Sequence, residues 1–147
     1  MPVTDDEIAA LRAHLQGNQA LQQELYEQIT TPAAKTKYMT LLAMAFFEAV
    51  NRRFGGRDSA AEVIEYVADV RARAPEVSEK IDPSAAERVI RRALTDDADV
   101  SDISDGMRGR IFLIFVLALV SDAEYDDDQL EAFLVEARKA ADDALEH

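Results

Sequence analysis

The feature that most constrains the fold of this chain is a run of ten consecutive apolar residues, Ile111–Val120. A helix over this run is apolar on every side, so it must be buried in a protein core or in a membrane. A membrane span requires about 20 apolar residues, whereas runs of about 10–14 are typical of core helices. Arg108 and Arg110 precede the run, and Asp122 follows it. The run therefore predicts a core helix over residues 105–121, with several other helices packed around it.

A second apolar segment predicts the main packing partner of that helix. Residues 38–50 carry a single charge, Glu48, and lie within a predicted helix over 32–54 that ends at Gly55. Neither helix has a face suited to water, so we expect the two to pack against each other at the centre of the domain. Glu48 is spaced to pair with Arg52 one helical turn later.

Shorter amphipathic patterns predict five further helices around this pair. Thr4–Glu7 and Ser59–Glu62 are capping-box sequences, and Asp82 followed by a proline opens another helix. A chain of 147 residues is of a size typical for one domain. We predict an all-α, single-domain bundle of about seven helices over residues 1–144. Residues 145–147 (Leu-Glu-His) resemble the start of a histidine tag and are interpreted as a tag remnant.

A weak internal similarity relates residues 67 positions apart. Ser59, Glu62 and Tyr66 correspond in this way to Asp126, Gln129 and Phe133. In both halves an apolar helix is followed by a short loop, a capping residue and an amphipathic helix. Two antiparallel helix pairs related by a pseudo-twofold axis are one interpretation, although helical periodicity alone would produce some of the matches.

Charge and composition narrow the classes of function. The net charge is −13 and there is no cysteine. Nucleic-acid binding requires clustered basic residues, so this charge argues against it. The absence of cysteine excludes disulfides and thiolate ligands and fits a reducing cytoplasm. With no membrane span and no secretory signal in the sequence, we expect a cytoplasmic protein. Its negative charge favours cations or basic proteins as partners, and a homo-oligomer is the other arrangement that the sequence allows.

Alternating carboxylates after the apolar run form the main candidate site. Asp122, Glu124, Asp126 and Asp128 occupy every second position, so an extended loop would direct them toward one centre. Carboxylates without histidine or cysteine suit hard cations such as calcium or magnesium. The segment lacks the glycine and the glutamate that an EF-hand requires at its sixth and twelfth positions. The competing interpretation is that Asp126 and Asp128 open the last helix, where capping and the helix dipole favour acids.

The candidate loop also carries a family resemblance. An apolar helix runs into Ser121–Gln129, which leads into an amphipathic helix, and Ala61–Tyr66 opens a helix of related pattern. These segments resemble the tellurite-resistance TerB family, whose members are all-helical domains of similar length with an acidic Asp-Gly loop between two such helices. In this chain Ala123 stands in place of the glycine, and Gln129 in place of a glutamate. The resemblance implies an acidic cation-binding surface and a role in stress response, with Asp122, Asp126 and Asp128 as the residues that match.

Two classes of function follow from these observations. The first is a non-enzymatic acidic binding module with a protein partner and a divalent-cation response. The alternative is an all-α, magnesium-dependent nucleotide pyrophosphohydrolase, because such enzymes place four carboxylates around magnesium. The carboxylate pairs that suggest it are Glu62 with Glu65 and Glu76 with Glu79. Glu62 already belongs to a capping box and the second pair precedes a predicted helix boundary, so we favour the non-enzymatic module.

Two further features have alternative interpretations. Arg88, Arg91 and Arg92 share one side of their predicted helix. They could hold a phosphate or an acidic partner, but a solvated face that offsets nearby carboxylates is the favoured interpretation. His14 has no second potential ligand near it in sequence, so we interpret it as a surface or boundary residue.

Overall fold

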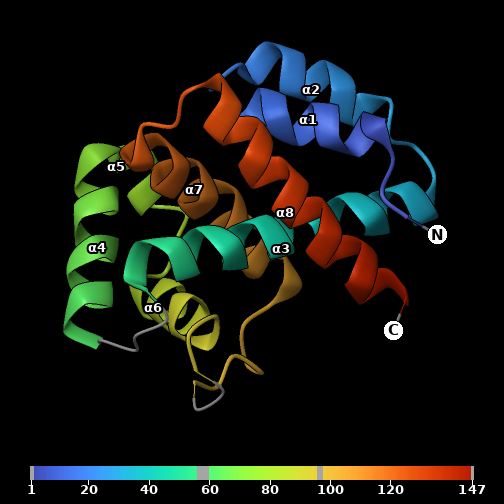
Figure 1. Ribbon diagram of the computed structural model, residues 1–147. Coiled ribbons are helices and arrows are strands. Elements are labelled where there is room, and N and C mark those ends of the chain that lie inside the picture. Colours follow the sequence, from blue (N-terminus) through green and yellow to red (C-terminus); the bar gives the residue numbers. More distant parts are fainter. Residues whose placement is uncertain (1, 56–59, 96–97, 147) are drawn as a thin grey trace.

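The computed structural model describes residues 2–55, 60–95 and 98–146, with the backbone alone for 77 and 78, and shows an all-α, single-domain bundle (Figure 1). Its helical segments are α1 (Asp5–Leu15), α2 (Gln19–Glu27), α3 (Pro32–Phe54), α4 (Ala60–Arg73), α5 (Pro75–Ser78), α6 (Pro83–Arg92), α7 (Asp105–Ala123) and α8 (Asp127–Glu146). Because α5 is a single turn, the described chain confirms the predicted bundle of about seven helices. No strand occurs in these residues.

The two predicted central helices, α3 and α7, lie in contact in the core. Phe46 on α3 and Phe115 on α7 have no exposed surface, and the rings of Phe46 and Phe112 are 4.9 Å apart between centroids. The enclosure of α7 is less complete than we expected. Leu113, Ile114 and Leu117 are only half-buried, because α3, α1 and α6 cover one side of the helix. None of the described helices has the length and apolarity that crossing a bilayer requires.

α3 and α7 run side by side in the same direction. Met39 and Met44 of α3 line a groove with Phe112, near the start of α7. Ala49, nearer the end of α3, lines a separate cleft with Leu119 of α7. Helix dipoles of parallel helices point the same way, so the starting ends of the pair are electropositive and the finishing ends electronegative. The groove and the cleft therefore lie in opposite electrostatic surroundings.

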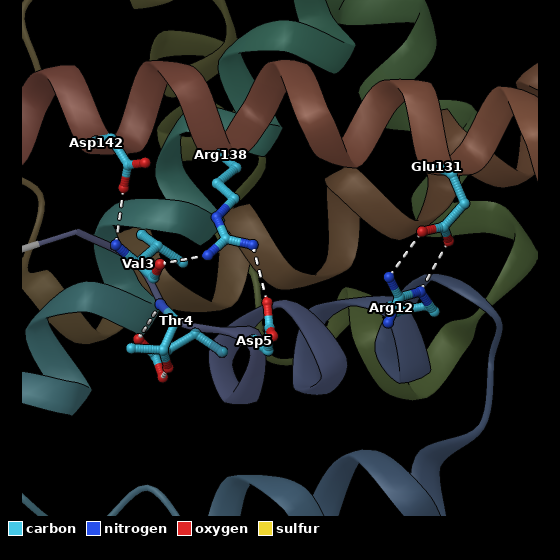
Figure 2. A network of polar contacts seen from close by, with 8 residues as sticks. Val3, Thr4, Asp5, Arg12, Glu131, Arg138 and Asp142 are labelled. Atoms are coloured by element: carbon cyan, nitrogen blue, oxygen red, sulfur yellow. Dashed lines mark hydrogen bonds and ion pairs between the residues drawn. The ribbon is translucent and has the colours of Figure 1, made fainter.

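The start of the chain is bonded to α8, which crosses α3 and α1 (Figures 1 and 2). Arg138 donates to the carbonyl of Val3 at 2.8 Å, and the Val3 amide donates to the Asp142 carboxylate at 2.8 Å. Arg12 of α1 binds Glu131 through two nitrogens, at 2.7 and 2.8 Å. Figure 2 shows how these bonds join segments that are far apart in the sequence.

Capping residues explain where several helices begin. Thr4 and Glu7 form the predicted capping box, and Glu7, only 3% exposed, accepts from the Thr4 amide at 3.1 Å. At the start of α8, the Gln129 amide donates to the Asp126 carboxylate at 2.8 Å, and the Asp126 amide donates to the side-chain oxygen of Gln129 at 2.9 Å. The Ser104 hydroxyl accepts an amide hydrogen bond in the first turn of α7, at 3.1 Å. The residues that begin these helices are therefore already committed to local hydrogen bonds.

The internal similarity is visible in local structure but not in packing. α4 begins at Ala60 and α8 at Asp127, and the preceding helices both end at a left-handed residue, Gly55 and Glu124. α8 packs along α3, whereas α4 packs mainly against α6. The two pairs thus have different surroundings, and the packing shows no twofold equivalence. Ser59, the first residue of the second predicted capping box, lies outside the described residues.

The last residues continue α8 without interruption. The helix reaches Glu146, and Leu145 is half-buried against the core. Of the residues interpreted as a tag remnant, His147 lies outside the described part of the chain.

His14 is a boundary residue with a specific partner, the Leu113 carbonyl, 2.7 Å from its Nε2. Burial lowers the pKa of His14 from its usual value of 6.5, and this outweighs the hydrogen bond to Leu113, which acts in the opposite direction. As the pH falls, the unfolded chain therefore gains a proton near pH 6.5, whereas the folded protein gains it only at a lower pH. We expect the free energy of unfolding to decrease as the pH falls below that value.

Urea denaturation at about pH 7.5 and about pH 5.5 measures this decrease. His14→Gln keeps a side-chain donor but does not titrate, so its decrease over the same interval should be smaller. Equal pH dependence in both proteins would contradict the assignment to His14.

Candidate functional site

A cleft of about 610 Å³ lies where the last turns of α3, α4 and α7 meet. Three arginines line it, Arg52 and Arg53 from α3 and Arg73 from α4, together with Asp122 and Tyr125. The remaining lining residues are the apolar Ala49, Leu119, Val120 and Ala123. Three arginines on one concave surface contrast with a chain that has 29 acidic and 16 basic residues. The cleft is thus a local exception to the acidic character of the protein.

Helix ends explain why arginines occur here. Arg52 and Arg53 lie in the last turn of α3, and Arg73 is the last residue of α4. Cations are favoured at helix C-termini because the last carbonyl groups carry partial negative charge. This accounts for the positions of the arginines in the sequence. It does not account for all three side chains lining one cleft, which depends on how the helices pack.

Asp122 joins α7 to α4 at the wall of the cleft. Its Oδ1 accepts from Arg73 at 2.8 Å and its Oδ2 from the Tyr66 hydroxyl at 2.9 Å, while Arg73 also pairs with Asp69. Partial burial would raise the pKa of Asp122, but the bonds from Arg73 and Tyr66 prevail and hold that pKa below its usual value. Burial and the bond to Asp122 raise the pKa of the Tyr66 hydroxyl. Both oxygens of Asp122 are therefore engaged within the protein.

Arg52 is fixed by several contacts. Its Nε donates to Glu48 at 2.9 Å, which confirms the predicted pair, and another nitrogen donates to the Tyr125 hydroxyl at 3.1 Å. Its guanidinium lies over the rings of Tyr125 and Phe133, 5.7 and 5.2 Å from their centroids. Arg52 thus forms a rigid part of the cleft wall.

Arg53 differs from the other two arginines. Its guanidinium carbon lies 5.3 Å from the ring centroid of Tyr66 and 5.8 Å from that of Phe54. Such cation–π contacts contribute about 0.5–1 kcal/mol each at exposed sites and hold the side chain in place. Within the described residues Arg53 has no hydrogen-bond or ion-pair partner, and it is exposed. Its donors are available to a ligand.

The four predicted metal ligands do not converge in the structure. α7 continues through Asp122, so this residue faces α4 instead of a loop, and Glu124 ends the helix with a left-handed backbone. Asp126 caps α8 through Gln129, and Asp128 lies in the first turn of that helix. Among the residues that the structure describes, no group of three or more acidic or histidine side chains is placed to hold a metal ion. The expected extended loop is replaced by helix ends.

The carboxylates of the enzyme alternative are also separated. Glu62 and Glu65 line a hollow with Asp69 and Arg53, whereas Glu76 and Glu79 do not line it, and no group of three or more described acids is placed to hold a metal ion. The four-carboxylate arrangement is therefore not found in the described part of the chain.

The predicted arginine cluster on α6 also has acidic neighbours. Arg88 pairs with Asp102 at 2.7 Å. This pair agrees with the interpretation of that helix side as a face that offsets nearby acids.

The residues at the cleft that were not predicted from the sequence are Arg53, Arg73 and Tyr66. The sequence feature that could have pointed to the arginines is their position in the last turns of two helices, in a chain with few basic residues. The contact of Asp122 with α4 had no local signal, because Tyr66 and Arg73 are 56 and 49 residues away in sequence.

Comparison with known proteins identified no relative of this chain. No family model, no curated protein and no solved structure matches the chain. The similarity to the TerB family accordingly stays a prediction from the sequence.

Proposed function

We propose that this protein is a non-enzymatic binding module that holds an anionic group of its partner in the arginine-lined cleft. The observation that carries the proposal is Arg53, an exposed guanidinium that is held over two aromatic rings. Among the described residues it makes no direct hydrogen bond or ion pair, although Asp122 lies near enough for the two charges to interact. A guanidinium presents its donors in a planar fork that matches a carboxylate or a phosphate.

The neighbours of Arg53 support selective binding of a small anion attached to an apolar body. Arg52 and Arg73 are neutralised by Glu48 and by aspartates, and the helix ends around the cleft are electronegative, so the attraction must come from the free donors of Arg53. The apolar lining of the cleft would contact the rest of the ligand. A hydrogen bond to a charged group contributes about 1.5–3 kcal/mol, which corresponds to about tenfold or more in affinity.

A divalent-cation response is the other binding function suggested by the sequence, together with the stress-related role that the TerB resemblance implies. It would have to use carboxylates that now cap α8 or bind Arg73. Any cation would therefore compete with bonds already made within the fold, and we favour the anionic ligand.

A titration with small probes tests the proposal. The probes are N-acetyl-leucine, which combines a carboxylate with an apolar body, its uncharged amide, and inorganic phosphate. We expect saturable NMR shifts at the ends of α3 and α7 with N-acetyl-leucine and none with the amide. Phosphate distinguishes recognition of a carboxylate from recognition of any small anion. Arg53→Gln should weaken binding at least about tenfold, because it removes the free guanidinium donors.

Lys139→Gln is the matched control, because it removes one positive charge from an exposed side chain of α8. Its affinity should equal that of the unmodified protein. Equal binding of the acid and its amide would contradict the proposal, as would unchanged affinity in Arg53→Gln. Saturable shifts of Asp122–Asp128 with calcium or magnesium, abolished in Asp122→Asn with Asp126→Asn, would instead support the cation response.

A further inference from the structure

The groove at the starting ends of α3 and α7 is a second candidate for binding, with a different chemistry. It encloses about 500 Å³ and lies at the opposite end of the α3–α7 pair from the cleft. Met39, Ala43, Met44 and Phe112 form its apolar part, and Lys35, Arg108 and Asp105 are among its polar lining residues. Met39 is 40% exposed, so part of this apolar side chain is accessible at the groove. Methionine side chains adapt readily to the shape of a partner.

The charge around this groove favours an acidic partner. The first turn of α3 holds no acid, and Lys35 has no ion-pair partner in the described part of the chain. Arg108 pairs with Asp105, whose side chain is 95% exposed, so solvent weakens that pair. Two helix N-termini add positive potential, which makes these cations unfavourable for the fold itself. Carboxylates from a partner would remove this repulsion.

Gly109 is the part of α7 that faces this groove without a side chain. It lies inside α7 without a left-handed backbone, and a Cβ atom there would meet only the Met39 Cε, at an ordinary distance of 3.6 Å. Nothing inside the chain therefore requires glycine, although glycine weakens a helix relative to alanine. The absent side chain keeps the α7 wall of the groove open to close approach by another backbone.

We infer that this groove binds an acidic amphipathic helix of a partner protein. The apolar side of that helix packs on Met39, Met44 and Phe112, and its carboxylates approach Lys35 and Arg108. A second copy of this chain is the less suitable occupant, because two copies that each carry a net charge of −13 repel each other more strongly than one copy repels a short helix with a few carboxylates. The inference does not depend on the arginine-lined cleft.

Selection from a display library of random helical peptides of about 20 residues tests the inference. The full chain is the target, and peptides that also bind Gly109→Leu are removed. We expect the enriched sequences to carry aspartate or glutamate together with apolar residues at helical spacing. A representative peptide, labelled and followed by fluorescence anisotropy, should lose at least about tenfold in affinity with Lys35→Glu combined with Arg108→Glu.

Control variants separate the groove from general electrostatics and from loss of folding. Lys80→Glu combined with Lys139→Glu changes the net charge equally but not the groove, and should keep the affinity. Gly109→Ala should raise the melting temperature and still weaken peptide binding, a combination that misfolding cannot produce. Arg53→Gln should leave peptide binding unchanged, so the inference and the proposed function can fail separately.

Three results would overturn the inference. One is the absence of enriched peptides, and another is enrichment of peptides without acidic residues. The third is sedimentation of the chain as a dimer that Gly109→Leu dissociates, which would assign the groove to a second copy.

Discussion

Phe115→Ala is expected to lower the free energy of unfolding by about 3–5 kcal/mol. Phe115 has no exposed surface and its ring lies 6.3 Å from that of Tyr66 between centroids, in the core between α7 and α4. Alanine would remove the aromatic ring and leave a cavity that the neighbouring helices can fill only in part. Since domains are stable by about 5–15 kcal/mol, this one change would remove a large part of the total.

Urea denaturation followed by circular dichroism measures the effect. Val135→Ala is a suitable control, because Val135 is an apolar side chain of α8 that is 51% exposed. Its change should stay within about 0.5 kcal/mol. A loss below about 1 kcal/mol for Phe115→Ala would show that the ring is not packed as described.

Asp122→Ala is expected to lower the free energy of unfolding by about 1–3 kcal/mol at neutral pH. The substitution removes the acceptor of the Tyr66 hydroxyl and one partner of Arg73, so α4 loses its polar connection to α7. The Asp122 side chain is 31% exposed, and water can replace part of what is lost. We therefore expect a cost below that of Phe115→Ala.

Measuring the free energy of unfolding of Asp122→Ala at several pH values tests whether the charged carboxylate causes this loss of stability. The pKa of Asp122 is lowered in the folded protein, so its contribution is complete above the unfolded value of about 3.9 and disappears as the pH falls through the folded value. The difference in the free energy of unfolding between the unmodified protein and Asp122→Ala should therefore decrease in acid. Asp143→Ala, an exposed change near the end of α8, should show neither effect. A difference that is constant down to about pH 3 would contradict this role of Asp122.

Elements with a local cause could be predicted from the sequence. The apolar run around Phe115 indicated a buried helix because such a helix has no polar face that water would solvate. The start of α1 followed from the spacing of Thr4 and Glu7, which can satisfy each other's backbone groups without help from the rest of the chain. In each case the deciding interactions join residues within a few positions of one another.

The candidate site could not be predicted in the same way, because its geometry depends on packing between distant segments. Asp122 was predicted to lie in an extended loop, but α7 continues two residues beyond its predicted end, to Ala123, and Asp122 binds Tyr66 and Arg73 of α4. Arg53 was not singled out, since its exposure and its lack of an acidic partner depend on where α4 lies. The alternating acids were predicted to form one metal site. Helix capping instead gives Asp126 a separate role, because it accepts the Gln129 amide at the start of α8.

The bonds between the first residues and α8 affect the order in which this protein can fold during synthesis. Val3 is bonded to Asp142, 139 positions later, and α8 is also the helix that crosses and packs against α3. A growing chain therefore exposes the apolar surface of α3 until α8 has left the ribosome. Contacts so distant in sequence slow folding relative to helical bundles that pack only neighbouring helices. We expect partly synthesised chains that end before α8 to bind chaperones and to resist release as folded domains.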